Sequence, residues 1–195
     1  MQVGEAAGDA ESVLLGLYRV VHNLSFPQPP EAEVVDSREI AAAFLQVATL
    51  ATVPLSPGDL RVEFAPPPHR RPARLPVGSQ GVYAFFLGEV CLKVGKAGPQ
   101  SAARYCSQHY GVNASSTLGK SILSHPEHIA TLLGPGAEAV PSSVEQLGSW
   151  IEAHTSRLNV LIPSRMGPFA LSLLEGFLQC RLHPLFEGPR GLNLS

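Results

Sequence analysis

The sequence predicts an α/β (α+β) protein, with a small mixed or antiparallel three-stranded sheet flanked by helices and an N-terminal helical extension. The 195 residues are 45% hydrophobic and 15% charged, which is enough apolar material for a buried core. Two apolar runs, 81–87 and 90–95, surround a short Gly-Glu turn and predict a β-hairpin. Helical patterns and one further strand follow the hairpin, which favours a mixed fold.

A helical region is predicted for residues 1–64. Apolar residues recur at the helical spacing within 10–23. A second helix is expected over 40–50, because Asp36 followed three residues later by Glu39 is typical of a capping box.

Residues 65–80 contain five prolines, which fix φ and remove backbone donors, so this segment is predicted to be an extended linker. The domain expected to carry the chemistry is 81–195. Its predicted elements after the hairpin are helices at 99–109, 126–133 and 142–154, a strand at 158–162 and a last helix at 167–182.

The chain is expected to be cytoplasmic and to have no membrane partner. Its first residues lack the basic and apolar regions of a secretory signal. The longest apolar run, 40–55, contains polar residues and prolines and is too interrupted to span a bilayer. Three widely spaced cysteines argue against a disulfide framework and fit a reducing compartment.

Charge is distributed unevenly along a chain whose formal net charge is only −2. Residues 1–68 hold nine acidic and three basic side chains, whereas residues 69–125 hold seven basic side chains and one acidic. Such a basic segment indicates a polyanion-binding surface, and a solvated face that binds nothing would show the same charge. The side chains assigned to nucleic-acid binding are Arg70, Arg71, Arg74, Lys96, Tyr105, Lys120 and Asn193.

No aspartate occurs after Asp59. A Ser-His-Asp triad of the usual kind is therefore excluded from the predicted domain, and a two-metal site built from several carboxylates is disfavoured. Any carboxylate chemistry there must use one of the seven glutamates that follow residue 80.

The segment 114–121, Ala-Ser-Ser-Thr-Leu-Gly-Lys-Ser, matches a loose phosphate-loop pattern and raises nucleotide hydrolysis as an alternative function. A working phosphate loop follows a buried strand, and the residues before this segment predict a helix end instead. It also needs a second strand that ends in an acid, whereas 158–162 is followed by Pro163-Ser164. The nucleotide hydrolase is accordingly the least favoured function.

Three pairs of metal-ligating residues are three positions apart in the chain: Cys106 and His109, His125 and His128, and Cys180 and His183. On a helix this spacing places two ligands on one side, which makes a structural zinc conceivable. No pair has the Cys-x-x-Cys spacing of a zinc knuckle, so buried cysteines and ordinary surface histidines are the favoured interpretation.

The hairpin and the last helix resemble the GIY-YIG endonuclease superfamily. Gly81-Val82-Tyr83 is similar to its first signature, and Lys93-Val94-Gly95 stands ten residues later, where the second signature (Tyr-Ile-Gly) is expected. The resemblance covers about residues 81–193, and its specificity comes from the joint order and spacing of the motifs. The residues that match the later motifs are Arg104, Glu175, Pro184 and Asn193.

This resemblance implies a metal-dependent DNA endonuclease that uses a single Mg²⁺ (or Mn²⁺), in a setting of restriction, defence or repair. It implies that Tyr83 is a water-activating or phosphate-facing phenol, that Arg104 contacts the scissile phosphate and that Glu175 is the metal ligand. The residue types suit these roles, because arginine binds phosphate bidentately and one carboxylate with waters can hold Mg²⁺. A tyrosine acts as a general base only where nearby cations lower its pKa from about 10.

Two positions depart from the family pattern. Lys93 replaces the second-signature tyrosine, as in some restriction-type members, and is interpreted as a base or a phosphate contact. One helical turn after Arg104, where the family tends to place His or Tyr, the chain has Gln108, flanked by Tyr105 and His109. We assign the supporting role to His109. The predicted catalytic set is Tyr83, Lys93, Arg104, His109 and Glu175.

A shared site requires Tyr83 and Lys93 to lie on one face of the sheet. A loop of Gly88-Glu89 alone would pair Tyr83 with Val94 and would place Lys93 on the opposite face. We therefore predict an odd-numbered loop, such as 87–89 with a bulge. The alternative from another functional class is a catalytically inactive nucleic-acid-binding or protein-binding module with the same fold.

Overall fold

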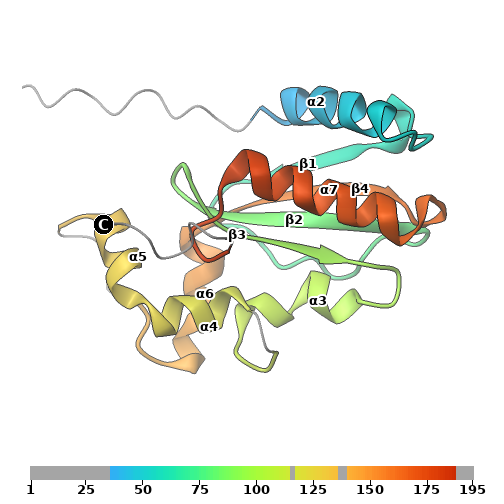
Figure 1. Cartoon of the computed structure of the whole chain (residues 1–195). Coiled ribbons are helices and arrows are strands. Elements are labelled where there is room, and N and C mark those ends of the chain that lie inside the picture. Colours follow the sequence, from blue (N-terminus) through green and yellow to red (C-terminus); the bar gives the residue numbers. More distant parts are fainter. Residues whose placement is uncertain (1–35, 115–116, 136–139, 188–195) are drawn as a thin grey trace, which may run out of the picture. The chain divides into compact units, whose positions relative to one another are not determined.

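A computed structural model describes the chain over residues 36–114, 117–135 and 140–187. All of these residues belong to one compact unit, Val34–Ser195. The helix expected within 10–23 and the predicted binding residue Asn193 lie outside the described residues. The predicted mixed class is confirmed, because an antiparallel sheet is flanked by helices (Figure 1). Within the described ranges no helix is long and apolar enough to cross a bilayer.

The sheet has four strands rather than the three predicted, in the order β1-β4-β2-β3 with antiparallel neighbours throughout. They are β1 (Arg61–Ala65), β2 (Ser79–Leu87), β3 (Val90–Ala97) and β4 (Ser156–Pro163). The additional strand, β1, comes from the region assigned to N-terminal helices and linker. Its Arg-Val-Glu-Phe sequence alternates polar and apolar residues, which is the period of a half-buried strand. The strand was missed because the prolines that follow it predicted an extended linker.

Six helices within the described ranges flank the sheet. They are α2 (Ser37–Leu50), α3 (Ala102–Cys106), α4 (Leu118–Ser124), α5 (Pro126–Leu133), α6 (Val144–His154) and α7 (Gly167–Leu182). The helix expected over 99–109 is divided into α3 and a 3-10 helix, Gln108–Tyr110. Helix α4 was not predicted, because its residues matched the phosphate-loop pattern. Its N-cap is Thr117, whose Oγ1 accepts a hydrogen bond from the Lys120 backbone at 3.1 Å.

Both faces of the sheet are covered (Figure 1). Side chains of β2 alternate between them, so that Val82 and Ala84 join one hydrophobic cluster with α2 and α7, while Tyr83 and Phe85 join a second cluster with α3, α4, α5 and α6. We call the first the α7 face and the second the α6 face. This double burial explains why β2 is a nearly continuous apolar run rather than an alternating one.

The proline-rich segment 65–80 is packed against the domain. The backbone N–H of His69 donates to the carbonyl of Glu152 at 2.8 Å. The His69 ring, which is only 4% exposed, bonds through Nδ1 to the carbonyl of Thr155 at 2.6 Å and through Nε2 to the Tyr110 hydroxyl at 2.8 Å. The segment is therefore held to α6 and to the 3-10 helix.

The loop between β2 and β3 differs from the predicted loop, but the hairpin still places Tyr83 and Lys93 on the same face of the sheet. The turn contains only Gly88-Glu89, with Gly88 at φ +57°, so the odd-numbered loop is wrong. One extra residue instead lies within β3, where the register shifts and Leu92 has no partner in β2. As a result Lys93 pairs with Phe85, and both share the α6 face with Tyr83.

Candidate active site at the edge of β3

Tyr83 and His109 form a buried hydrogen-bonded pair on the α6 face. The Tyr83 hydroxyl oxygen lies 2.7 Å from His109 Nε2, and the Leu118 backbone N–H donates to His109 Nδ1 at 3.2 Å. Since a backbone N–H can only donate, the neutral ring carries its proton on Nε2 and donates to the Tyr83 oxygen. The Tyr83 proton is then left to donate elsewhere, and no described residue accepts it.

Burial sets the protonation of both groups, because Tyr83 is 1% exposed and His109 is 3% exposed. Burial raises the pKa of Tyr83, although the charges of Arg104 and Arg157 act in the opposite direction. Burial also lowers the pKa of His109 to about 3, and the Lys93 charge adds to this effect. The water-activating role for Tyr83 requires a lowered pKa, whereas burial acts in the opposite direction. A neutral phenol that can donate a hydrogen bond remains.

Both signature glycines are required by close approaches. The ring of Tyr83 lies over Gly95, where a Cβ atom would be 2.8 Å from Tyr83 Cε2 and 2.9 Å from its hydroxyl. At Gly81 a Cβ would be 2.5 Å from Leu161 Cδ2 and 2.7 Å from the Val160 carbonyl oxygen. Gly95 thus lets the Tyr83 side chain extend across β3, which is the outermost strand on this side of the sheet.

Lys93 is half of an ion pair at that outer edge. Its Nζ lies 2.9 Å from Oε1 of Glu187, and the backbone N–H of Val94 donates to Oε2 of the same glutamate at 3.1 Å. Glu187 is placed by the segment after α7, in which the Leu185 backbone donates to the Cys91 carbonyl at 2.8 Å. Lys93 is only 3% exposed, so in this structure it is a partner for Glu187 rather than a free phosphate contact.

Arg104 supplies the exposed cation of the site. It lies in the last turn of α3 and has no ion-pair partner among the described residues. Burial raises the pKa of Tyr83, and the Arg104 charge offsets part of that rise. An exposed, unpaired guanidinium is suited to a phosphate group.

Glu175 approaches from the α7 face. Its Oε2 lies 2.7 Å from Nζ of Lys96, which also donates to the Ser172 hydroxyl at 3.2 Å. Lys96 pairs with Val82 and therefore lies on the face opposite to Tyr83. The Glu175 charge has the smallest of the effects on the pKa of Tyr83, and the two side chains make no direct contact.

One carboxylate oxygen of Glu175 is free of protein partners in the described part of the chain. Its Oε1 has no partner among the described residues, and the side chain is 21% exposed, so water can complete a coordination shell. The Lys96 ammonium pairs with Oε2, so a metal ion bound at Oε1 would lie close to a positive charge.

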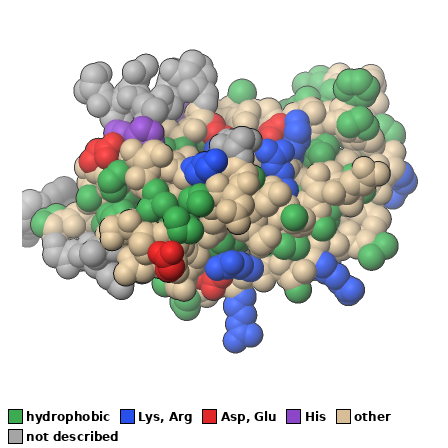
Figure 2. Space-filling model, turned by 90° about the horizontal axis from the view of Figure 1, so that it is seen from below, with side chains coloured by type: hydrophobic (Ala, Val, Ile, Leu, Met, Phe, Trp, Pro, Cys, Tyr) green, Lys and Arg blue, Asp and Glu red, His purple; other side chains and the backbone are tan. Residues whose placement is uncertain are grey.

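A separate open cleft of ≈ 580 Å³ lies on the α6 face, beside β1. Three of the predicted binding residues line it, namely Arg70, Arg74 and Tyr105, and Asn159 lies at the same wall. Figure 2, which views this side of the molecule, shows Lys and Arg side chains projecting from it. The full lining is Arg61, Glu63, Arg70, Pro72, Ala73, Arg74, Pro76, Val77, Tyr105 and Asn159.

The other predicted binding residues lie elsewhere. Arg71 forms an ion pair with Glu152, and its guanidinium lies 4.6 Å above the Tyr110 ring, which makes it a clamp for the proline-rich segment. Lys96 belongs with Glu175, as described above. Lys120 is exposed at the start of α4, and the residues before it, Gln108–Tyr110, form a 3-10 helix, whereas a phosphate loop follows a strand.

Arg157 is the functional candidate that sequence reasoning missed. It is 1% exposed, and it donates to Asn159 Oδ1 at 2.9 Å, to the Tyr110 hydroxyl at 3.1 Å and to the Tyr105 carbonyl at 2.7 Å. Its guanidinium also lies 4.9 Å from the Tyr83 ring centre. No carboxylate in the described part of the chain pairs with it, so aromatic faces and neutral acceptors alone stabilise this buried charge.

A signal for this residue was present in the sequence. Arg157 directly precedes the strand expected at 158–162 and Asn159 lies within it, so these two polar residues alternate with Leu158 and Val160. A charged residue in an otherwise apolar strand indicates a buried polar network, because an unpaired charge there would be costly.

Comparisons with protein-family models, with curated proteins and with solved structures found no match to this chain. The similarity to GIY-YIG endonucleases therefore rests on the motifs described above.

Proposed function

We propose that this protein is a metal-dependent DNA endonuclease of GIY-YIG type, which hydrolyses phosphodiester bonds at the edge of β3. The observation that supports the proposal is the Tyr83–His109 hydrogen bond beside β3. The charges of Arg104 and Glu175 both act on the pKa of Tyr83, although neither side chain contacts it.

The roles follow from the contacts. Arg104 neutralises the phosphate, since its guanidinium is exposed and unpaired among the described residues. Tyr83 is 1% exposed, so the edge of β3 must open before its free proton can reach a phosphoryl oxygen. His109 orients the phenol by donating to its oxygen. Preorganised donors of this kind stabilise the charge that develops in the transition state.

Glu175 would hold one Mg²⁺ through its carboxylate, with Lys96 fixing the orientation of that carboxylate. When bound, the metal supplies charge neutralisation on the phosphate and lowers the pKa of a coordinated water. Lys93 and Glu187 are assigned to positioning, because their ion pair fixes the outer edge of β3 beneath the Tyr83 side chain.

The cleft beside β1 favours a second candidate function, which is binding of nucleic acid without cleavage. Arg70 and Arg74 have no ion-pair partner in the described ranges, and Tyr105 and Asn159 offer an aromatic and an amide group beside them. Arginines of this kind bind the phosphate backbone without sequence specificity.

A nicking assay tests the proposal. Supercoiled plasmid is incubated with the full chain and Mg²⁺, and then with EDTA, and relaxed product is measured against time. We expect cleavage that EDTA abolishes and that Glu175→Gln and Arg104→Ala each reduce at least ~100-fold, the scale of a lost transition-state contact. Arg38→Ala is the matched control, since this exposed arginine lies on α2, and it should leave the rate unchanged.

Three outcomes separate the candidates. Cleavage that persists in Glu175→Gln rejects the metal site as assigned. DNA binding without cleavage by the wild-type chain, under any divalent metal, supports the binding module. Loss of both binding and cleavage on mutation of the cleft alone would place the substrate there rather than at the β3 edge.

A further inference from the structure

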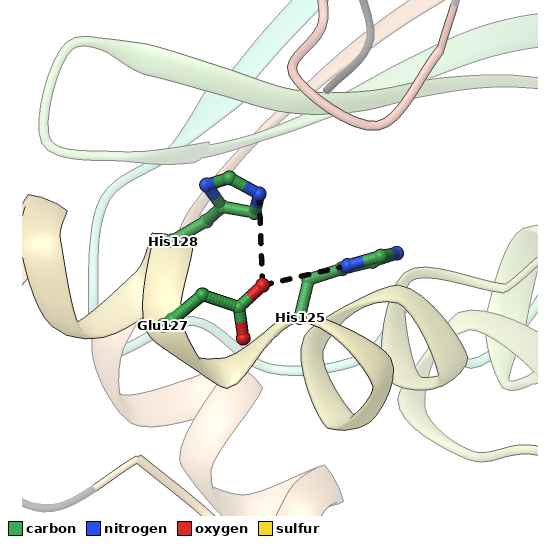
Figure 3. Close-up of side chains that lie close together, drawn as sticks. All are labelled: His125, Glu127 and His128. Carbon is green, nitrogen blue, oxygen red and sulfur yellow. Dashed lines mark ion pairs between the residues drawn. The ribbon is translucent and has the colours of Figure 1, made fainter. Parts of the chain in front are cut away.

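A second cluster of ligating side chains lies where α4 ends and α5 begins. His125, Glu127 and His128 each offer one ligand atom, and these atoms all lie within 4.8 Å of one another (Figure 3). None of these residues takes part in the Tyr83 site.

The separations within the cluster fit a shared metal ion better than direct contact. Nδ1 of His125 lies 3.5 Å from Oε1 of Glu127, and Nε2 of His128 lies 3.6 Å from the same oxygen. Both distances exceed those of ordinary hydrogen bonds. Ligand atoms bound tetrahedrally to one zinc ion at about 2.0–2.1 Å stand about 3.4 Å apart, so only small side-chain shifts separate this arrangement from a site.

Local structure creates the cluster. His125 is both the C-cap of α4 and the N-cap of α5, with φ −136° and ψ 56°, and Pro126 begins α5. The turn directs His125 toward the first turn of α5, which carries Glu127 and His128. Because four consecutive residues supply three ligands, no long loop must be ordered to form the site.

A neighbouring ring orients His125, and all three ligand side chains are partly exposed. The ring of His125 is stacked on Phe186, with 6.2 Å between the ring centres and 25° between the planes. The side chains of His125 and His128 are 34% and 22% exposed, and Glu127 is 64% exposed, so an ion can enter from solvent.

The ligand set selects the metal. Two imidazoles and one carboxylate suit Zn²⁺, whereas Mg²⁺ prefers oxygen ligands and water. The positive end of the α5 dipole opposes a cation at this place, and the Glu127 carboxylate offsets it.

We propose that His125, Glu127 and His128 bind one Zn²⁺ ion, with a water molecule in the fourth position. The site is independent of the proposed nuclease function. From the sequence, His125 and His128 were expected to be ordinary surface histidines. The proposal revises that expectation, because the structure adds Glu127 as a third ligand that the spacing of the two histidines did not reveal.

Metal titration tests the site. The metal-free full chain is titrated with Co²⁺, whose visible absorption reports tetrahedral coordination, and then with Zn²⁺, which should displace it; calorimetry gives the stoichiometry. We expect one ion per chain. His128→Ala and Glu127→Gln should each weaken binding at least tenfold. His183→Asn is the matched control, because His183 is an exposed histidine at φ +46°, which asparagine tolerates.

The variants are expected to melt at the wild-type temperature without metal, since the three side chains are partly exposed. Unchanged zinc affinity in both variants, or no binding by the wild-type chain, would overturn the proposal. Glu175→Gln should retain full zinc affinity, and His128→Ala should retain Mg²⁺-dependent nicking. Failure of one proposal is thereby distinguishable from failure of the other.

Discussion

The hydroxyl oxygen of Tyr83 accepts a hydrogen bond of 2.7 Å from Nε2 of His109, whose other ring nitrogen is fixed by the Leu118 backbone. This relationship determines that His109 is the donor and that the Tyr83 proton is available to another acceptor. It connects a strand of the central sheet to a 3-10 helix that follows α3, and it is the buried part of the proposed active site.

Replacing Tyr83 by phenylalanine should separate the packing of its ring from the hydrogen bonding of its hydroxyl. The ring still packs on Gly95, but the buried Nε2–H of His109 loses its acceptor. We expect a loss of about 1–3 kcal/mol in the free energy of unfolding, measured by urea denaturation. If Tyr83 donates to the phosphate, nicking should also fall far more than this loss explains in a chain that is still folded. A Tyr83→Phe chain with wild-type nicking would exclude the phenol from the chemistry.

Gly95→Ala should be strongly destabilising, because its Cβ would stand 2.8 Å from a buried ring that has little space to move. Overpacking of this kind costs about 1–3 kcal/mol or more. Gly98→Ala is the control, since no atom lies within 4 Å of a Cβ there. Combining Gly95→Ala with Tyr83→Ala should recover part of the loss, and strictly additive effects in that double-mutant cycle would contradict the contact.

Acid should destabilise the protein through His109. Its pKa is lowered to about 3, so the folded state keeps the ring neutral while the unfolded chain takes up a proton below about pH 6.5. The contribution of His109 to the free energy of unfolding is therefore fully present above pH 6.5. As the pH falls toward 3, this contribution decreases by about 1.4 kcal/mol per pH unit. Burial lowers the pKa of His69 as well, which acts in the same direction.

The measurement is the free energy of unfolding between pH 7 and pH 4 for the wild-type chain and for His109→Gln. Glutamine does not titrate in this range, so the slope should become shallower in the variant. Equal slopes for the two chains would show that His109 is not kept neutral by the fold.

Arg157→Lys should destabilise the chain by about 2–4 kcal/mol, in the range of a broken buried network. Lysine cannot reproduce three directed bonds to Asn159, Tyr110 and the Tyr105 carbonyl while lying over aromatic rings. Arg165→Lys is the control, because the side chain of Arg165 is 66% exposed and its ion pair is worth little. Similar melting temperatures for the two variants would contradict the role assigned to Arg157.

Mutating the arginines of the cleft should weaken binding to all DNA sequences equally. Arg70→Ala and Arg74→Ala each remove one predicted phosphate contact, so each should lower the slope of log affinity against log salt by about 1. Arg71→Ala is an informative comparison, because its ion pair with Glu152 makes it a structural residue. Its salt slope should stay near that of the wild-type chain while its stability falls.

The sequence by itself determined the local elements of this protein. The bounds of α5 and α7 agree with the helical periodicity and the helix-start signals, and Asp36 caps α2 by accepting a hydrogen bond from the Arg38 backbone at 2.8 Å. Hydrophobic pattern, capping residues and turn residues act over a few positions, so they can be recognised without knowledge of the fold. The order of these elements also predicted the fold class.

Tertiary structure alone decided the register and the partners. The bulge at Leu92 places Lys93 beside Phe85, and the segment after α7 brings Glu187 to Lys93 across more than ninety residues of chain. Likewise Arg157 is buried by residues from three separate elements, and burial rather than residue type sets the pKa of Tyr83. These properties depend on which distant groups share a low-dielectric interior, and no local pattern in the sequence encodes that.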